Sequence, residues 1–210
     1  MKRKPGERTL LASVILSSPG PVVVGIGLFL GRSSTQYADF IRRTGELAAI
    51  IVSWIVFRAL HRSGEVDGAR KLKLERTANL CVGTAMCLSG IAMLFLALFS
   101  HSAEKGNVIP GLVIAVLGVT TNTWFWLRYR KLDLDKPDPI LAVQKKLYRA
   151  KSLVDACVTI ALAAVAVAPQ SSAARYMDLG GSIIVSVYLV VTGLATIRAF
   201  YKPGIQPDAA

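Results

Sequence analysis

Six apolar stretches of membrane-spanning length are the feature that most limits how this chain of 210 residues can fold. A helix needs about 20 predominantly apolar residues to cross the hydrocarbon core of a bilayer. The apolar residues here run in blocks of that length instead of recurring at the spacing of an amphipathic helix. The blocks predict an all-α membrane protein, a six-transmembrane-helix bundle. The predicted spans are residues 10–31, 36–60, 78–100, 107–127, 147–168 and 177–200.

Lys and Arg are unevenly distributed over the segments that connect the spans. The chain has a formal net charge of +12, and most of the basic residues outside the spans lie in the tail 1–9 and in the segments 61–77 and 128–146. The alternate connections carry only Arg32, Lys105 and Arg175. Because basic residues favour the cytoplasmic side, both the N- and the C-terminus are predicted to be cytoplasmic. The expected partners are the bilayer and anionic lipid at its cytoplasmic face, not nucleic acid.

These patterns divide the chain into three parts. Residues 1–9 are a basic cytoplasmic tail, residues 10–200 a transmembrane domain, and residues 201–210 a short C-terminal tail. We expect an integral, multi-pass protein of the plasma (inner) membrane. The chain has 2 histidines and shows no Ser-His-Asp arrangement, metal-binding His cluster or phosphate-binding loop, so neither an enzymatic activity nor a resident cofactor is predicted.

Two charged pairs lie inside otherwise apolar segments. Arg42 and Glu46 belong to the second predicted span, and Lys151 and Asp155 belong to the fifth. In each pair the two residues are four positions apart, about one helical turn, so they share one face of a helix. Ionisable groups within the hydrocarbon are costly and therefore mark a functional site or pair with one another. Glu46 and Asp155 lie at similar depth and would be level if their helices are neighbours.

Two interpretations of these four residues remain open. In the first, Arg42 and Lys151 neutralise Glu46 and Asp155 in a buried ion-pair network. In the second, the two carboxylates are ligands in a site for a cation or a proton. The spacing of the residues is the same in both cases, so it does not separate them.

Further polar residues lie within or beside the spans. Asp39 and Arg43 form another pair four residues apart in the second span, near enough to the outer surface for their side chains to reach it. Asn122, in the fourth span, either faces a transport pathway or bridges neighbouring helices. Asp138 followed by Pro139 is typical of the start of a helix, with the aspartate as its cap.

Several stretches resemble the membrane domain of the cation diffusion facilitator (cation efflux) family. In its second span that family typically reads S-x-x-x-x-A-D-x-x-H-S-x-x-D, and residues 34–49 here are similar to it. In its fifth span it carries H-x-x-x-D, where this chain has Lys151 and Asp155. The segments 106–112 and 176–181 resemble the entries to the family's fourth and sixth spans.

The resemblance implies a six-helix fold with cytoplasmic termini, usually in a homodimer. It also implies export of a divalent metal ion, mostly zinc or manganese, against a proton gradient, with the metal ion as the substrate. Carried over by position, Glu46 and Asp155 correspond to the second acid of each of the family's two metal-binding pairs. They are therefore the candidate metal ligands.

The chain departs from the family pattern at both first positions. Arg42 and Lys151 stand where the family places histidine or aspartate, and a protonated side chain cannot bind a metal ion. The chain also ends soon after the sixth span, so the family's cytoplasmic C-terminal domain is expected to be missing. We therefore expect a transporter that moves a cation, either alone or coupled to protons, and that uses Glu46 and Asp155. The alternative is a transport-inactive structural or partner-binding relative whose four charges form a salt-bridge network.

Overall fold

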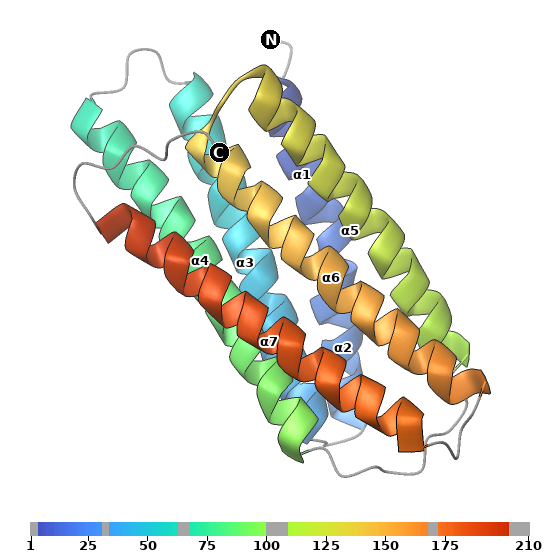
Figure 1. Ribbon diagram of the computed structural model, residues 1–210. Coiled ribbons are helices and arrows are strands. Elements are labelled where there is room, and N and C mark those ends of the chain that lie inside the picture. Colours follow the sequence, from blue (N-terminus) through green and yellow to red (C-terminus); the bar gives the residue numbers. More distant parts are fainter. Residues whose placement is uncertain (1–3, 31–33, 63–67, 100–108, 168–171, 202–210) are drawn as a thin grey trace.

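The computed structural model describes residues 4–30, 34–62, 68–99, 109–167 and 172–201. Within these ranges the chain is helical and contains no strand (Figure 1). The helices are α1 (Pro5–Ser17), α2 (Pro19–Leu30), α3 (Ser34–Arg62), α4 (Gly68–Phe99), α5 (Ile109–Asp135), α6 (Pro139–Val167) and α7 (Ser172–Tyr201).

The first predicted span consists of α1 and α2, which only Ser18 separates. Pro19 and Pro21 lie in the first turn of α2. Proline has no N–H and is tolerated there because the N–H groups of a first turn have no partner within the helix. The backbone N–H of Ser18 still donates to the carbonyl of Val14, at 3.0 Å. The described helices therefore confirm a six-helix bundle whose first span is built from two short helices.

The helices pack side by side in one bundle (Figure 1). α4 packs along α7, α5 along α6 and α3 along α4, while α1 and α2 lie against α3. Close approach between α4 and α7 depends on small residues, since a Cβ at Gly90 would lie 2.8 Å from the carbonyl oxygen of Ser186. The end of the bundle where α1 and α6 begin and α3 ends is called the basic end below.

Polar side chains are enclosed by this bundle, and large apolar side chains cover its outside. Val23 is 65% exposed, Leu117 61% and Ile184 71%. In water such a surface would mark a site of association or aggregation, whereas lipid is its natural solvent. The buried polar side chains are Glu7, Thr9, Ser13, Glu46, Ser53, Asn79, Ser89, Gln144, Ser152, Ser186 and Thr196. This arrangement supports a membrane protein.

By length and composition alone, two helical segments in the described part of the chain are suited to cross a membrane. They are Gly68–Phe95 in α4 and Leu179–Ala199 in α7. α3 and α6 have 29 residues each, more than the roughly 20 that a span needs. These two helices carry the charged pairs, so the site lies between them.

Candidate functional site

Lys151 and Glu46 form an ion pair between α6 and α3. Nζ of Lys151 lies 3.3 Å from Oε2 of Glu46, and only 15% of the lysine side chain and 7% of the glutamate side chain are exposed. This contact joins the two charged pairs that the sequence places in separate spans. Removing two charges from water is costly, and their attraction offsets that cost only while both partners remain.

Two more side chains hold the Glu46 carboxylate. Ser89 on α4 donates a hydrogen bond from Oγ to Oε1 of Glu46 at 2.9 Å. Nη1 of Arg42, one turn earlier on α3, lies 3.8 Å from the same oxygen. Nζ of Lys151 also lies 5.2 Å from the centre of the Tyr148 ring, a distance at which a cation is attracted to the ring face. The carboxylate is therefore fixed from three helices and faces two cations.

Asp155, one turn beyond Lys151 on α6, is held by α5. Nδ2 of Asn122 donates a hydrogen bond to Oδ2 of Asp155 at 2.6 Å. A Cβ at Gly118, one turn before Asn122, would lie 2.7 Å from the same oxygen, so the carboxylate approaches α5 where glycine leaves room for it. The two candidate carboxylates thus have different partners. Glu46 has two cations and a hydroxyl group, and Asp155 has an amide.

The remaining predicted residues of the site lie on α3. Arg43 lies near α2, since a Cβ at Gly20 would be 3.4 Å from Nη1 of Arg43. Asp39 is part of α3, but its side chain lies outside the described residues. The structure therefore brings Arg42 and Glu46 to Lys151 and places Arg43 at another helix contact.

Ser89 and Gly118 also belong to the site; the sequence marks Ser89 only as a polar residue within a span that can bridge helices, and it does not single out Gly118. Serine and glycine are frequent in packed membrane helices, where they bridge helices or let them approach. The role of each residue becomes visible only when α4 and α5 are placed against the carboxylates. No spacing within the sequence carries that information.

The described residues do not form a complete metal site. Among them, no group of three or more His, Cys, Asp or Glu is placed to hold a metal ion. Glu46 and Asp155 offer carboxylate oxygens, which suit manganese better than zinc, because zinc is usually held by four ligands rich in imidazole or thiolate. The Lys151 ammonium and the Arg42 guanidinium have only hydrogen-bond donors. A cation that binds Glu46 would therefore compete with the ammonium group.

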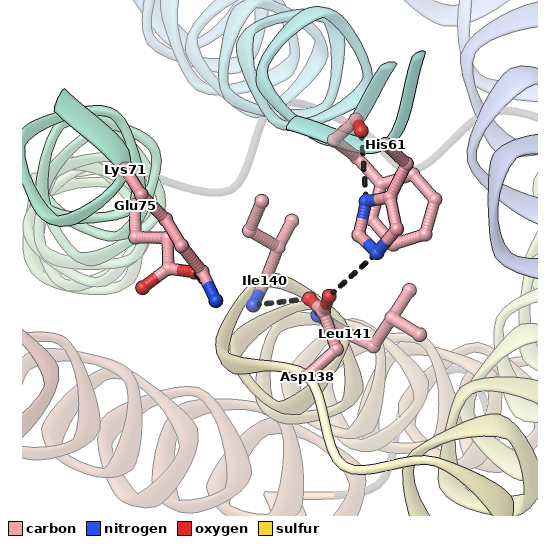
Figure 2. A network of polar contacts seen from close by, with 7 residues as sticks. His61, Lys71, Glu75, Asp138, Ile140 and Leu141 are labelled. Carbon is pink, nitrogen blue, oxygen red and sulfur yellow. Dashed lines mark hydrogen bonds and ion pairs between the residues drawn. The ribbon is translucent and has the colours of Figure 1, made fainter. Parts of the chain in front are cut away.

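A second polar network lies at the basic end (Figure 2). Nε2 of His61, in the last turn of α3, lies 3.6 Å from Oδ2 of Asp138. Nδ1 of His61 lies 3.0 Å from the carbonyl oxygen of Phe57. Oδ1 of Asp138 accepts hydrogen bonds from the backbone N–H groups of Ile140 at 2.9 Å and Leu141 at 3.3 Å. These bonds confirm the predicted cap at the start of α6 and hold Asp138 against α3.

Glu75 on α4 lies beside this network (Figure 2). Nζ of Lys71, one turn earlier, is 4.0 Å from Oε1 of Glu75. Partial burial raises the pKa of Glu75 above its usual value; the positive charge of Lys71 opposes this rise and the negative charge of Asp138 adds to it. The negative charge of Asp138 therefore disfavours the ionised form of Glu75.

Comparison with protein families matches residues 10–202 to the cation efflux transmembrane domain. The match covers nearly the whole chain, including both charged pairs and the loop between α5 and α6. A comparison with curated proteins finds no match.

Proposed function

This chain belongs to the cation efflux family, and from that premise we propose that it transports a cation through the membrane with Glu46 and Asp155 as its intramembrane carboxylates. Members of this family are transporters and not enzymes. The family match spans the bundle from α1 to α7. The polar interior and apolar exterior of that bundle fit a protein that offers an ion a polar route through lipid.

The observation that carries the proposal is the placement of the two acids. Glu46 and Asp155 are presented to the interior from α3 and α6, and each is oriented by a neutral donor, Ser89 for one and Asn122 for the other. A carboxylate that already accepts one hydrogen bond keeps further lone pairs for a cation. Lys151 lies one turn before Asp155 on α6, and its ammonium contacts Glu46 on α3.

Lys151 has a direct part in this proposal. Its ammonium neutralises Glu46 in the absence of a transported ion, so the buried carboxylate is never left alone. A divalent cation that enters must displace the Lys151 ammonium from the Glu46 carboxylate. If the ammonium then releases its proton, one positive charge leaves as two arrive, and the neutral amine becomes a possible ligand. Proton coupling would follow from this exchange.

The finer features of the proposal come from the resemblance and from the charge pattern. Zinc and manganese are the proposed substrates, and the carboxylate oxygens favour manganese. The bundle is proposed to form a homodimer in the plasma (inner) membrane, with cytoplasmic termini and its basic end against anionic lipid. Residues 1–9 and 201–210 are proposed to be short cytoplasmic tails on the transmembrane domain.

A transport-inactive relative is the second candidate, and the 3.3 Å contact between Lys151 and Glu46 favours it. In that case the paired charges only fix α3 against α6. Such a protein would act as a structural or partner-binding membrane component. The two candidates differ in whether a metal ion can displace the ammonium.

Equilibrium binding distinguishes them. Purified protein in detergent is titrated with manganese and with zinc by calorimetry. The transporter predicts saturable binding that Glu46→Gln and Asp155→Asn each weaken, while Asp135→Asn on the exposed end of α5 leaves it unchanged. It also predicts tighter binding by Lys151→Met, because the competing ammonium is gone. Absence of binding by folded wild type and by Lys151→Met would support the inactive relative.

A further inference from the structure

Three polar bridges connect α3 to α6 at regular intervals. From the basic end inward they are His61 to Asp138 at 3.6 Å, Gln144 Nε2 to Ser53 Oγ at 2.8 Å, and Lys151 Nζ to Glu46 Oε2 at 3.3 Å. Successive bridges are about two helical turns apart on both helices, or roughly 10 Å at 1.5 Å per residue. The six residues are called the α3–α6 seam below. The seam runs from the end of the bundle to the buried ion pair.

Gln144 in the middle of the seam has an unused acceptor. Its side chain is 0% exposed, and Nε2 donates to Ser53. The Ser53 hydroxyl group donates in turn to the carbonyl oxygen of Ala49 at 2.8 Å. Among the described residues, no group donates to Oε1 of Gln144. A buried acceptor without a donor is costly, and an internal water molecule is the usual remedy where polar groups surround the place.

The outer bridge connects this interior to solvent. The side chain of His61 is 23% exposed and that of Asp138 is 14% exposed, whereas Glu46 at the inner bridge is 7% exposed. Figure 2 shows His61 facing Asp138 from α3, with Glu75 and Lys71 of α4 on the other side of the α6 start. The seam therefore has titratable groups at both ends and hydrogen-bonding groups between them.

We propose that the α3–α6 seam is a hydrated proton path between the basic end and the Lys151–Glu46 ion pair. A chain of hydrogen-bonded water molecules, one of them held at Oε1 of Gln144, spans the intervals between the bridges and carries protons from the His61–Asp138 bridge to the Lys151–Glu46 pair. Each water molecule accepts one proton and releases another, so none is consumed. The use of this path in ion exchange rests on the proposed function, whereas the hydration of the seam does not.

Cysteine reactivity tests hydration directly. In a chain whose Cys81, Cys87 and Cys157 are replaced by alanine, Ser53→Cys and Gln144→Cys are introduced one at a time. Val56→Cys and Val143→Cys are the matched controls. Ser53 and Gln144 are 1% and 0% exposed, and Val56 and Val143 are 5% and 4% exposed within the hydrophobic core of the same two helices. Each variant is reacted with 2-aminoethyl methanethiosulfonate after its folding has been checked by cooperative melting.

The proposal predicts that cysteines at 53 and 144 react at least about tenfold faster than those at 56 and 143, because only a hydrated thiol forms the reactive thiolate readily. Equally slow reaction at all four positions would overturn the proposal, because it would show that water does not reach the polar bridges. Equally fast reaction would overturn it too, because the whole bundle would then be open to water.

Gln144→Leu gives a second measurement that needs no introduced cysteine. This variant keeps a similar side-chain volume but removes the polar atoms. In vesicles that contain a pH-sensitive dye, it should slow manganese-driven proton movement with little change in manganese affinity, while Leu147→Met on the same helix should not. An unchanged rate in Gln144→Leu would contradict the path. Fast thiol reaction in a protein that transports no ion would support the path and refute the proposed function.

Discussion

The Lys151 ammonium lies 3.3 Å from Oε2 of Glu46, where an ion held by that carboxylate would have to bind. In this arrangement the protein carries its own cation at the site. Ser89 on α4 donates a hydrogen bond to the Glu46 carboxylate, and the Arg42 guanidinium on α3 lies near the same oxygen. Removal of any one charge leaves another charge buried, so stability and ion binding are linked at these residues.

A double-mutant cycle on Lys151 and Glu46 measures how strongly the two side chains stabilise each other. Lys151→Met and Glu46→Gln are each expected to lower the free energy of unfolding by up to about 3–5 kcal/mol, because Lys151→Met leaves Glu46 with only the more distant Arg42 guanidinium at 3.8 Å and Glu46→Gln leaves the buried ammonium without its carboxylate. The double variant should lose much less than the sum of the two. Unfolding in detergent gives all four values. Additive effects would mean that the two side chains do not interact.

Gly118→Ala tests the close approach of Asp155 to α5. The added Cβ would lie 2.7 Å from Oδ2 of Asp155, so the carboxylate must move and its hydrogen bond from Asn122 must lengthen. We expect weaker manganese binding with a melting temperature near that of wild type. Gly180→Ala on α7 is the control, because its Cβ would have no neighbour within 4 Å. Equal affinities in both variants would show that the position of Asp155 is unimportant for binding.

Glu75→Gln is expected to stabilise the protein near neutral pH. The pKa of Glu75 is raised in the folded protein, mainly by burial, so folding favours its protonated form. The stability that Glu75 contributes is therefore present below its unfolded pKa and is lost as pH rises through the raised folded pKa.

Melting temperatures of wild type and Glu75→Gln between about pH 4 and pH 8 test this sign. The advantage of the variant should appear at the upper end of that range and vanish at the lower end. Asp135→Asn, at an exposed position, should show no such trend. A variant less stable than wild type at neutral pH would mean that the contact with Lys71 outweighs burial.

Much of the fold could be predicted from the sequence, because it depends on local features. Blocks of apolar residues predicted the spans, and the break in the first span falls at Ser18, directly before Pro19. Asp138 before Pro139 predicted the cap of α6, since a capping side chain bonds to backbone within the next few residues.

The partners of the charged residues could not be predicted in the same way. The four-residue spacing places Lys151 beside Asp155 on one face of α6, yet the ammonium contacts Glu46 on another helix. Its long side chain reaches between helices, so its partner depends on how α3 and α6 pack. Asp155 instead contacts α5, because Asn122 supplies a donor and Gly118 leaves space. The partners of Lys151 and of Asp155 are thus both set by contacts between helices.

Ion flux in proteoliposomes measures directly whether Glu46 and Asp155 carry cation transport. Manganese and zinc movement is followed with an imposed pH gradient for wild type, Glu46→Gln, Asp155→Asn and the control Asp135→Asn. Transport through these carboxylates predicts flux in wild type and in the control, and its loss in both carboxylate variants. No flux of either metal through demonstrably folded wild type, or flux that persists without both carboxylates, would contradict it.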